Sequence, residues 1–464
     1  MTKWYHYERA RQAATFGQVA RSVAKKVGSN RVAPEDGQES TGNGIAAVEI
    51  LPEYIKVKEL LDSGTKMILV SGGAGTGKST FMRWIRSEYE GSVLVTAPTG
   101  IAALTVGGQT LHSLCSFPPA WILPSDIRRK SKSPVAHADI LVLDEVSMVN
   151  ANLLDAVDAF LRLNRKSSDP FGGISVVLVG DLFQLPPIVT KETKHLFDEE
   201  YHSPRFFAAR ALDTVRFEDV ELTQTFRQSD PRFVEILHRI RLGEDLTNAV
   251  DELNRGASIS PEGRDNAVWL CPRNADVDRI NNTRLERLTG VVKTYESSTT
   301  GNYRSSPLPV PAHLTLKVGA QVVMANNTSE WVNGSIATVT DVLPSKIRIR
   351  LNQSNKIHEV TTHTWEQYEY VLNEESGAIE RVVTGTFTQI PANLAWAMTI
   401  HKSQGLTLEN VHLDLGAGAF ATGQTYVALS RCTALANLSM SRALEERDVL
   451  VDPEATAFYQ ALQE

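Results

Sequence analysis

Cysteine is scarce in this chain, and long hydrophobic runs are absent. The three cysteines, Cys115, Cys271 and Cys432, stand far apart in 464 residues. That spacing matches no metal-ligand or redox motif, so it indicates a reducing compartment without a disulfide framework, and we expect the cysteines to fill small core positions. Because no apolar run approaches the length needed to cross a bilayer, a helical membrane protein is excluded.

An excess of positive charge is also missing. Lysine and arginine number 47 against 54 aspartate and glutamate residues, which gives a net charge of −7. A protein that coats nucleic acid through bulk positive charge is therefore disfavoured, although a local groove can still be basic on an acidic molecule. The chain is too long for one hydrophobic core, so we expect several domains.

Short, continuously apolar segments alternate with helical ones over much of the chain. In the first half these strand candidates are 67–70, 92–96, 140–143 and 175–179. Continuous hydrophobicity marks strands that are buried on both faces, which predicts an α/β domain with a parallel sheet wrapped by helices. A second set begins near Val220 and includes candidates at 267–270, at 410–415 and near the C-terminus.

The period of the hydrophobic pattern changes between about residues 303 and 380. Short strand candidates at 321–325, 335–342, 346–351 and 357–362 are separated by turn signals such as Val332-Asn333-Gly334. This pattern predicts a small antiparallel barrel inserted into the second α/β domain. The preceding stretch, 295–311, is rich in Ser, Thr and Pro, and we expect it to be a loop.

A glycine-rich segment, Ser71–Thr80, directly follows the first apolar strand and precedes a helical pattern at 81–89. Its backbone amides can point at phosphate oxygens, and the helix dipole adds to the attraction. Lys78 would reach the β and γ phosphates, and the Ser79 hydroxyl would join a Mg²⁺ shell. The residues expected to cradle the phosphates are Gly73, Ala74, Gly75, Thr76, Gly77, Lys78, Ser79 and Thr80. The sequence therefore predicts binding and hydrolysis of a nucleoside triphosphate.

Two acids, Asp144 and Glu145, end the apolar strand at 140–143. A pair of acids after a strand can be a solvated turn, but open α/β sheets place their ligands at this edge. After a phosphate loop the pair predicts a metal and water site. Asp144 would hold Mg²⁺ through its water shell, and Glu145 would polarise the water that attacks the γ phosphate.

Three further polar residues stand in suitable settings for the γ phosphate. Gln184 lies just past the next strand, in Val179–Pro187, where a neutral amide could sense whether the phosphate is present. Arg227 and Arg431 belong to the second domain in this interpretation, and a guanidinium is well suited to a phosphoryl group. Taken alone, each arginine would be interpreted as a surface ion-pair partner. If both face the first domain, the nucleotide would open and close the cleft.

The ordered motifs resemble the Pif-one helicases, in the Pif and RecD-like group of superfamily 1. The resemblance spans roughly residues 50 to 445 and is carried by Asn164–Ile174 before Gly180–Pro187, and by Thr96–Ala103, Thr399–Thr407 and Tyr426–Arg431. It implies an ATP- and Mg²⁺-dependent monomer that moves 5′ to 3′ on single-stranded DNA and separates duplexes at junctions. Lys78, Glu145, Gln184, Arg227 and Arg431 would be its catalytic residues, the two arginines acting as fingers.

The resemblance also implies a domain plan and a set of DNA contacts. The plan has two RecA-like domains, 47–215 and 216–302 with 381–464, an SH3-like barrel at 303–380 and a wedge insertion near 117–134. The strand-binding positions would be Pro98, Thr99, His112, Phe117, Asn274, His401, Lys402 and Ser403. For single positions other interpretations stay open, since Phe117 could be a core aromatic and His112 a satisfied buried imidazole.

Residues 1–46 lie outside these domains in this plan. They are locally basic up to about residue 34, with a lone acid, Glu8, and are turn-rich from there to 46. An organellar transit peptide would look similar, but Glu8 is atypical of such peptides. We therefore expect an accessory helix, solvated or facing DNA, followed by a linker. The location would be the bacterial nucleoid or, in a eukaryote, the nucleus or a mitochondrion.

Several alternatives stay open at this stage. The segment Ile50–Gly64 has no glutamine to read the adenine edge, so hydrolysis of other triphosphates is plausible. A DNA-dependent ATPase that remodels protein-DNA complexes, or a nucleotide-switched DNA-binding module, would carry many of the same motifs. G-quadruplexes and RNA-DNA hybrids are further candidate substrates, and no membrane partner is expected.

Overall fold

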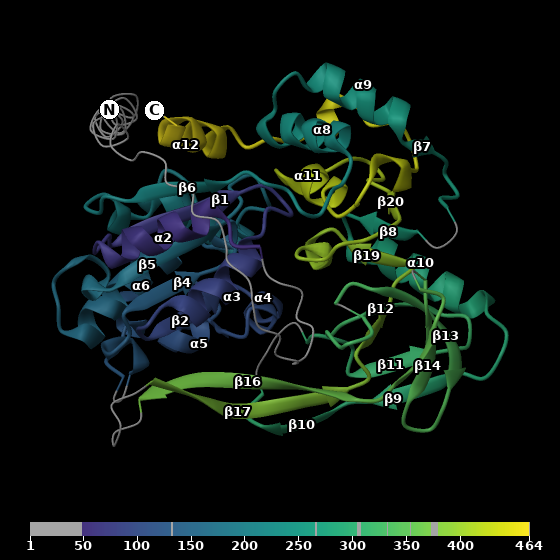
Figure 1. The fold of residues 1–464 in the computed structure, drawn as a ribbon, viewed down its shortest axis with the longest axis horizontal. Coiled ribbons are helices and arrows are strands. Elements are labelled where there is room, and N and C mark those ends of the chain that lie inside the picture. Colours follow the sequence, from purple (N-terminus) through teal and green to yellow (C-terminus); the bar gives the residue numbers. More distant parts are fainter. Residues whose placement is uncertain are drawn as a thin grey trace, which may run out of the picture.

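The computed structural model describes residues 49–130, 133–264, 267–303, 308–331, 333–352, 354–372 and 379–463. The predicted extension and linker at 1–46 lie outside these ranges, as does Val332 of the predicted turn. Two lobes built on parallel sheets stand side by side, and a group of antiparallel strands lies beneath the second lobe (Figure 1). The predicted α/β architecture with two RecA-like domains is confirmed.

The first domain is built on a wholly parallel sheet in the order β3-β2-β4-β5-β1-β6. Its strands are β1 (Met67–Gly72), β2 (Val93–Ala97), β3 (Gln109–Thr110), β4 (Ile140–Leu143), β5 (Ser175–Gly180) and β6 (Glu218–Leu222). The side chains of β1 are buried on both faces, as its continuous hydrophobicity predicts. The phosphate loop therefore leaves from the interior of the sheet.

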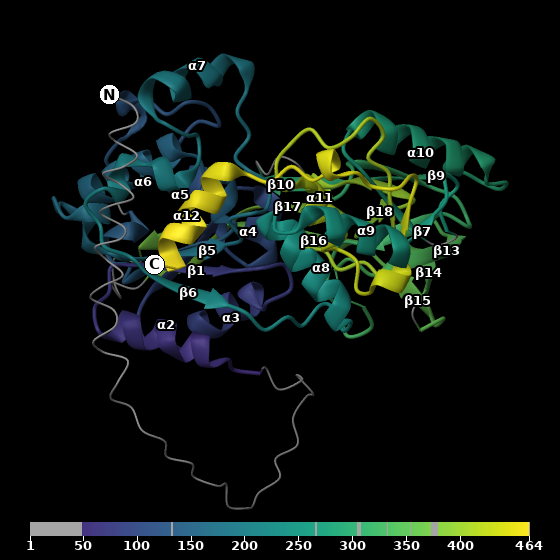
Figure 2. The same ribbon diagram turned by 90° about the horizontal axis from the view of Figure 1, so that it is seen from above.

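Helices cover both faces of this sheet. They are α2 (Pro52–Asp62), α3 (Lys78–Glu88), α4 (Gly100–Thr105), α5 (Leu111–Cys115), α6 (Ala151–Arg165) and α7 (Lys191–Glu200). Tyr54 of α2 and Phe81 of α3 join Ile68 in the core of one face, while Phe160 of α6 joins Leu69 on the other. Figure 2 shows α2 and α3 on one side of the strands and α6 on the other.

The second domain has its own parallel sheet, in the order β19-β8-β20-β21-β7. Its strands are β7 (Ser258–Ile259), β8 (Val268–Cys271), β19 (Ala397–Thr399), β20 (Val411–Leu413) and β21 (Leu438–Met440). Its helices are α8 (Pro231–Leu242), α9 (Leu246–Gly256), α10 (Asn274–Arg287) and α11 (Gln424–Leu429). The last of these, α11, is buried along its length.

An antiparallel insertion separates β8 and α10 from β19. The strands predicted from the changed period are present as a sheet in the order β15-β14-β13-β12-β18. They are β12 (Gln321–Met324), β13 (Ile336–Val342), β14 (Ile347–Leu351), β15 (Ile357–Val360) and β18 (Ala392–Leu394). The remaining strands are β9 (Lys293–Glu296), β10 (Ser298–Gly301), β11 (His313–Leu316), β16 (His363–Leu372) and β17 (Ile379–Gln389). The insertion therefore exceeds the predicted range of 303–380.

The expected loop at 295–311 is partly wrong. Strand β9 pairs with β11, and β10 pairs with β17, although their sequences are polar. The Tyr295 ring is buried, and its hydroxyl donates to the carbonyls of Leu343 and Lys346. Pairing with partners distant in the sequence makes these segments strands despite their weak local pattern.

The predicted boundary between the domains at 215/216 is wrong by one strand. Strand β6 lies after that boundary but pairs in parallel with β1, at the edge of the first sheet. Its charged sequence, Glu218 to Leu222, suits an edge position but does not reveal which sheet it joins. The linking segment, with Arg227, therefore leaves directly from the strand beside the phosphate loop.

The predicted place of the C-terminal helix α12 (Pro453–Gln463) in the second domain is also wrong. Ala455 is part of the first domain's core, and Phe458 stacks on Phe207 at 4.5 Å between ring centroids. Arg205 also forms an ion pair with Asp452, immediately before the helix. Figure 2 shows α12 crossing onto the first lobe, so the chain's end ties the two lobes together.

A second connection runs through the insertion. The β16–β17 hairpin extends back beneath the first domain (Figure 1), where β16 contacts β3 and α5. Trp365 and Phe387 of this hairpin pack with Val310 into a small core, against which Leu104 of α4 lies. In the ranges that the structure describes, no helix combines the length and apolar character of a membrane span.

Candidate active site

The glycine-rich turn between β1 and α3 has a backbone that other residues could not adopt without strain. Gly75 and Gly77 have φ angles of 84° and 91°. A Cβ on Gly75 would lie 2.6 Å from the Cβ of Arg227, and one on Gly77 would lie 2.5 Å from the Tyr54 hydroxyl. The turn is thus a tight cradle at the N-terminus of α3, which fits phosphate groups.

Lys78 is the first residue of α3, and its Nζ bends back into the cradle. It donates to the carbonyls of Gly72 and Gly73, both at 2.8 Å. Burial lowers the pKa of this ammonium, while the carboxylates of Asp181 and Glu145 oppose that shift. The Ser79 side chain is exposed beside it, and Thr76 Oγ1 donates to the Gly73 carbonyl at 2.9 Å.

Asp144 and Glu145 follow β4 at the same edge of the sheet. Glu145 has a φ of 48°, and its Oε2 is buried without a hydrogen-bond partner among the described residues. Burial raises the pKa of both carboxyl groups; the charge of Glu145 adds to the shift at Asp144, and Lys78 opposes the shift at Glu145. Strain and an unsatisfied carboxylate are features of a functional site.

The donor set fits Mg²⁺ bound chiefly by water and phosphate. Carboxylate and hydroxyl oxygens from Asp144 and Ser79 are hard ligands of the kind that Mg²⁺ prefers. No group of three or more His, Cys, Asp or Glu side chains forms a metal cage in the described ranges. A Mg²⁺ ion that keeps several waters needs few protein ligands, so these residues are compatible with it.

Arg227, in the segment that links the domains, and Arg431, just after α11, form the wall opposite the acids. Arg227 donates from Nε to Thr407 Oγ1 at 3.0 Å and from its NH1 group to the Ser430 carbonyl at 3.2 Å. Arg431 is fully buried and donates to the Val427 carbonyl at 3.0 Å and to Ser430 Oγ at 2.8 Å. Burial and the neighbouring charge of Arg431 lower the pKa of Arg227 to about 9.

The charges of both walls act on one carboxylate. Lys78, Arg431 and Arg227 each hold the pKa of Glu145 down against its burial. Arg227 also lies beside the phosphate loop, since a Cβ on Gly75 would lie 2.6 Å from its own Cβ. Clustered cations, two of them guanidinium groups, fit a polyanion such as a triphosphate.

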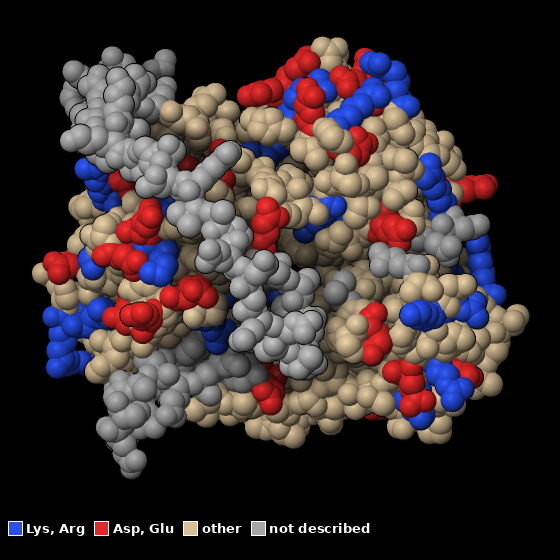
Figure 3. Space-filling view, viewed as in Figure 1, with Lys and Arg blue, Asp and Glu red and all other residues tan. Residues whose placement is uncertain are grey.

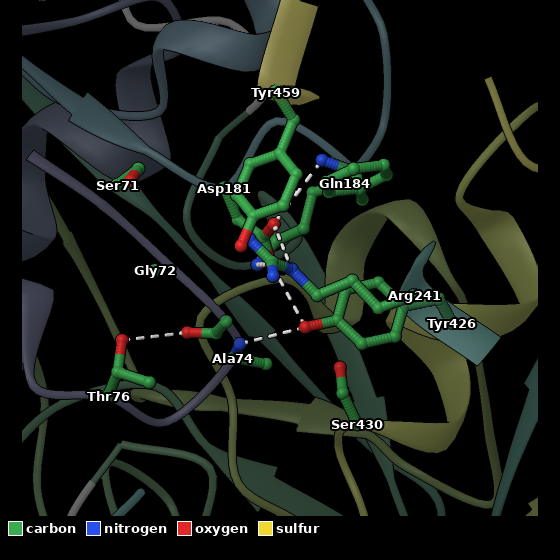
Figure 4. A network of polar contacts seen from close by, with 12 residues as sticks. Ser71, Gly72, Ala74, Thr76, Asp181, Gln184, Arg241, Tyr426, Ser430 and Tyr459 are labelled. Carbon is green, nitrogen blue, oxygen red and sulfur yellow. Dashed lines mark hydrogen bonds and ion pairs between the residues drawn. The ribbon is translucent and has the colours of Figure 1, made fainter. Parts of the chain in front are cut away.

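Gln184 lies at this site but is held by another residue. Its Nε2 donates to Asp181 Oδ2 at 3.3 Å, and the side chain is buried. Asp181 also pairs with Arg241 and accepts from Tyr426, two residues of the second domain (Figure 4). The sequence alone predicts a role for none of Asp181, Arg241 and Tyr426. Asp181 and Tyr426 lie within the motifs Gly180–Pro187 and Tyr426–Arg431, which could have indicated a role for them. No local sequence pattern indicates a role for Arg241.

Phe226 is another residue of the site for which the sequence alone predicts no role. Its backbone amide donates to the Gly75 carbonyl at 2.9 Å, and its ring would lie 3.5 Å from a Cβ on Gly77. The side chain is nevertheless 48% exposed. An uncovered aromatic ring beside a phosphate cradle is suited to stack on a planar base. Its position directly before Arg227 could have indicated that it belongs to the site.

The predicted DNA contacts fall into two groups. Asn274 at the start of α10 and Lys402 are exposed, and Pro98, Thr99, His112 and His401 are partly buried. The Thr99 hydroxyl caps α4 by accepting from the Ala102 amide at 3.3 Å. Burial lowers the pKa of His112 and of His401.

Two of the predicted contacts are wrong as direct side-chain contacts in this conformation. Phe117 is 5% exposed and packs edge-on against Phe160 at 5.8 Å, so the core interpretation applies. Ser403 is fully buried, and its hydroxyl donates to the Ile400 carbonyl at 2.8 Å. Neither side chain can reach a nucleic acid without rearrangement of the core.

The segment expected to be a wedge spans about 117–134, and its residues from Ile122 to Lys130 lie against α6. Buried Asn164 accepts from the Lys130 amide at 2.8 Å and donates to the Arg128 carbonyl at 3.3 Å. Asn152 similarly accepts from the Ile122 amide at 2.9 Å. The loop is thus anchored to the first domain, and the Arg128 side chain is exposed.

Known proteins resemble this chain over nearly its whole length. The family model described as PIF1-like helicase matches residues 54–251. The ATP-dependent DNA helicase PIF1 of Emericella nidulans is 32% identical over 92% of this chain and 65% of its own length. The Homo sapiens protein of the same name is 34% identical over 85% of this chain and 61% of its own length. The chain thus spans slightly less than two thirds of these relatives.

Solved structures of a Bacteroides Pif1 match more completely. Its complex with ADP-AlF4 has a TM-score of 0.82 and 32% identity, and the match covers 89% of this chain and 97% of that one. Its complex with ADP-AlF3 and single-stranded DNA has the same identity and coverage, with a TM-score of 0.66. On this identity, coverage and shared fold, the chain belongs to the Pif1 family of helicases.

Proposed function

We propose that this chain is an ATP-dependent DNA helicase that moves 5′ to 3′ on single-stranded DNA and unwinds duplex or structured DNA. One observation carries the proposal: Arg227, in the segment between the lobes, lies beside the phosphate loop, and its charge acts on Glu145 together with those of Lys78 from the first lobe and Arg431 from the second. A site divided between two lobes lets nucleotide binding and release move the lobes relative to each other. The names of the relatives support the same activity.

The geometry supports the hydrolytic roles that we propose. Lys78 would neutralise the β and γ phosphates, and Glu145, with its unpartnered Oε2, would orient and polarise the attacking water. Arg227 and Arg431 would stabilise charge on the transferred phosphoryl group after exchanging their carbonyl partners for phosphate oxygens. Gln184 would sense that group through its amide. Mg²⁺, held by Ser79 and through water by Asp144, would supply further neutralisation of the phosphate oxygens.

The nucleic-acid side of the site connects to both arginines. The segment from His401 to Thr407 carries the predicted DNA contacts His401 and Lys402. Within the same segment, Thr407 accepts from Arg227, and the Leu406 carbonyl accepts from Arg431 at 3.4 Å. A strand that displaces this segment would therefore shift the arginines, which couples DNA to hydrolysis.

We expect the DNA to be gripped through its backbone rather than read by sequence. On the face drawn in Figure 3, acidic and basic side chains are mixed over both lobes. Sequence-tolerant motors need hydroxyls, amides and a few cations at phosphates, such as Thr99, Lys402 and Asn274. We propose single-stranded DNA and its junctions as the partners of a monomer, with G-quadruplexes and RNA-DNA hybrids as further substrates. The protein would act in a bacterial nucleoid or, in a eukaryote, in the nucleus or a mitochondrion.

Phe226→Ala should weaken nucleotide binding without removing the chemistry. Loss of one stacking ring is expected to raise the KM for ATP about tenfold, with kcat within about threefold, because a base-aromatic stack contributes roughly 1–3 kcal/mol. Steady-state hydrolysis over a range of ATP concentrations measures this. Phe420→Ala, which removes another exposed phenylalanine, is the control. Equal KM values for the Phe226 variant and the unmodified chain would contradict a stacking role.

Hydrolysis and strand separation, measured together, test the proposed function. ATP turnover is measured with and without single-stranded DNA, beside unwinding of duplexes that carry either a 5′ or a 3′ tail. We expect DNA to stimulate hydrolysis and the 5′-tailed duplex to be unwound. Stimulation without unwinding would indicate an ATPase that remodels protein-DNA complexes. Hydrolysis that DNA does not change would indicate a nucleotide-switched binding module.

A further inference from the structure

The Tyr426 hydroxyl joins the second domain to the backbone of the phosphate loop. Tyr426 lies on α11, and its hydroxyl accepts a hydrogen bond from the Ala74 amide at 2.9 Å (Figure 4). It also donates to Asp181 Oδ2 at 2.9 Å. The ring is 5% exposed, so both bonds are shielded from water and depend on the position of α11.

The charge of Asp181 fixes the direction of these bonds. Arg241 of α8 donates from Nε to Asp181 Oδ1 at 3.0 Å. Although burial opposes ionisation, the cations Arg241 and Lys78 hold the pKa of Asp181 below its usual range. A carboxylate only accepts, so Tyr426 must donate to it and keeps its lone pairs for the Ala74 amide. Asp181 therefore orients the tyrosine toward the phosphate loop.

The same helix, α11, also contacts the segment that carries Arg227. The Ser430 carbonyl, directly after α11, accepts from Arg227 at 3.2 Å and from Gln228 Nε2 at 3.0 Å. At the other end of α11, Gly423 packs closely against the first domain. A Cβ on Gly423 would lie 2.4 Å from the Phe183 carbonyl oxygen. A shift of α11 would move the phosphate loop and the arginines at the same time.

We propose that Tyr426 is a positioning residue that conveys the placement of the second domain to the Ala74 amide, so that DNA-driven closure sets the phosphate loop for hydrolysis. The inference rests on the proposed function. It gives Tyr426 a role in turnover rather than in nucleotide affinity, because the other loop amides and Lys78 still bind the phosphates. It also assigns Asp181 and Arg241 the task of holding the tyrosine.

Tyr426→Phe tests the inference, and Tyr459→Phe is its matched control. Each substitution removes one phenol hydroxyl and keeps the ring. The Tyr459 hydroxyl donates to Glu221 at 2.9 Å, and its ring lies 5.5 Å from that of Phe183 and under Arg241. It thus belongs to the same interdomain cluster but does not contact the phosphate loop. Melting temperature and circular dichroism are measured for both variants to establish that they fold.

We expect Tyr426→Phe to lower DNA-stimulated kcat by about 10- to 100-fold, the range for a displaced reacting geometry. The KM for ATP and the affinity for single-stranded DNA should stay within about threefold, and Tyr459→Phe should keep kcat within about twofold. Equal kcat values for the two variants, with equal losses of melting temperature, would overturn the inference and leave a structural role. If the unmodified chain fails to hydrolyse ATP, the proposed function fails instead.

Discussion

Lys78→Ala should abolish ATP hydrolysis and leave binding of single-stranded DNA largely intact. The substitution removes the only lysine of the phosphate loop, whose Nζ lies at the Gly72 and Gly73 carbonyls. Without that charge, the β and γ phosphates lose their main contact with the first domain. Turnover is measured with saturating single-stranded DNA, and binding by fluorescence anisotropy of a labelled oligonucleotide. Unchanged hydrolysis would refute the assignment of the nucleotide site.

Lys66→Ala is the control for that variant. Lys66 directly precedes β1, the strand that leads into the phosphate loop. It is exposed and donates to the Gly173 carbonyl at 3.0 Å. Its loss should change turnover by no more than about twofold, as expected for a surface substitution. A comparable decrease in both variants would show that general damage to the first domain, rather than loss of a phosphate contact, explains the result.

Arg431→Ala is expected to lower turnover by about two orders of magnitude or more, as losses of arginine fingers do. The buried guanidinium also satisfies the Val427 and Leu406 carbonyls, so the alanine variant should be less stable as well. Arg431→Lys separates the two effects, because it keeps a cation but loses the planar, bidentate group. Single-turnover hydrolysis and the melting temperature are measured for both variants.

The control is Arg442→Lys, which changes an arginine of the same domain away from the nucleotide site. Arg442 forms a two-bond ion pair with Asp448, at 2.7 Å for each bond. The Arg442→Lys variant should lose some stability and keep its turnover within about twofold of the unmodified chain. If Arg431→Lys melts like the unmodified chain and loses less than about tenfold in turnover, Arg431 is not a finger.

Local sequence predicted the nucleotide wall of the first domain because each part is short and contiguous. The apolar run before Ser71, the glycine turn and the helix from Lys78 form one unit whose geometry follows from residue type. Asp144 and Glu145 were likewise found because a buried strand ends at them. Chemistry encoded within about ten residues is readable without knowledge of tertiary contacts.

Features set by distant contacts were not predictable. Strand β6 joins the first sheet and α12 packs on the first domain, although both lie outside its predicted range. The burial of Phe117 depends on Phe160, and the role of Arg241 depends on Asp181. No periodicity or motif marks such pairs, since the partners are far apart in the sequence and meet only in the folded chain.

The most direct test of the central claim is a crystal structure of this chain with ADP, aluminium fluoride and Mg²⁺. The shared site requires the fluoride group to lie between Lys78 Nζ on one side and the Arg227 and Arg431 guanidinium groups on the other, all within hydrogen-bonding distance. The account would be contradicted by a nucleotide that contacts the first domain alone, with both arginines still bonded to the Ser430 and Val427 carbonyls.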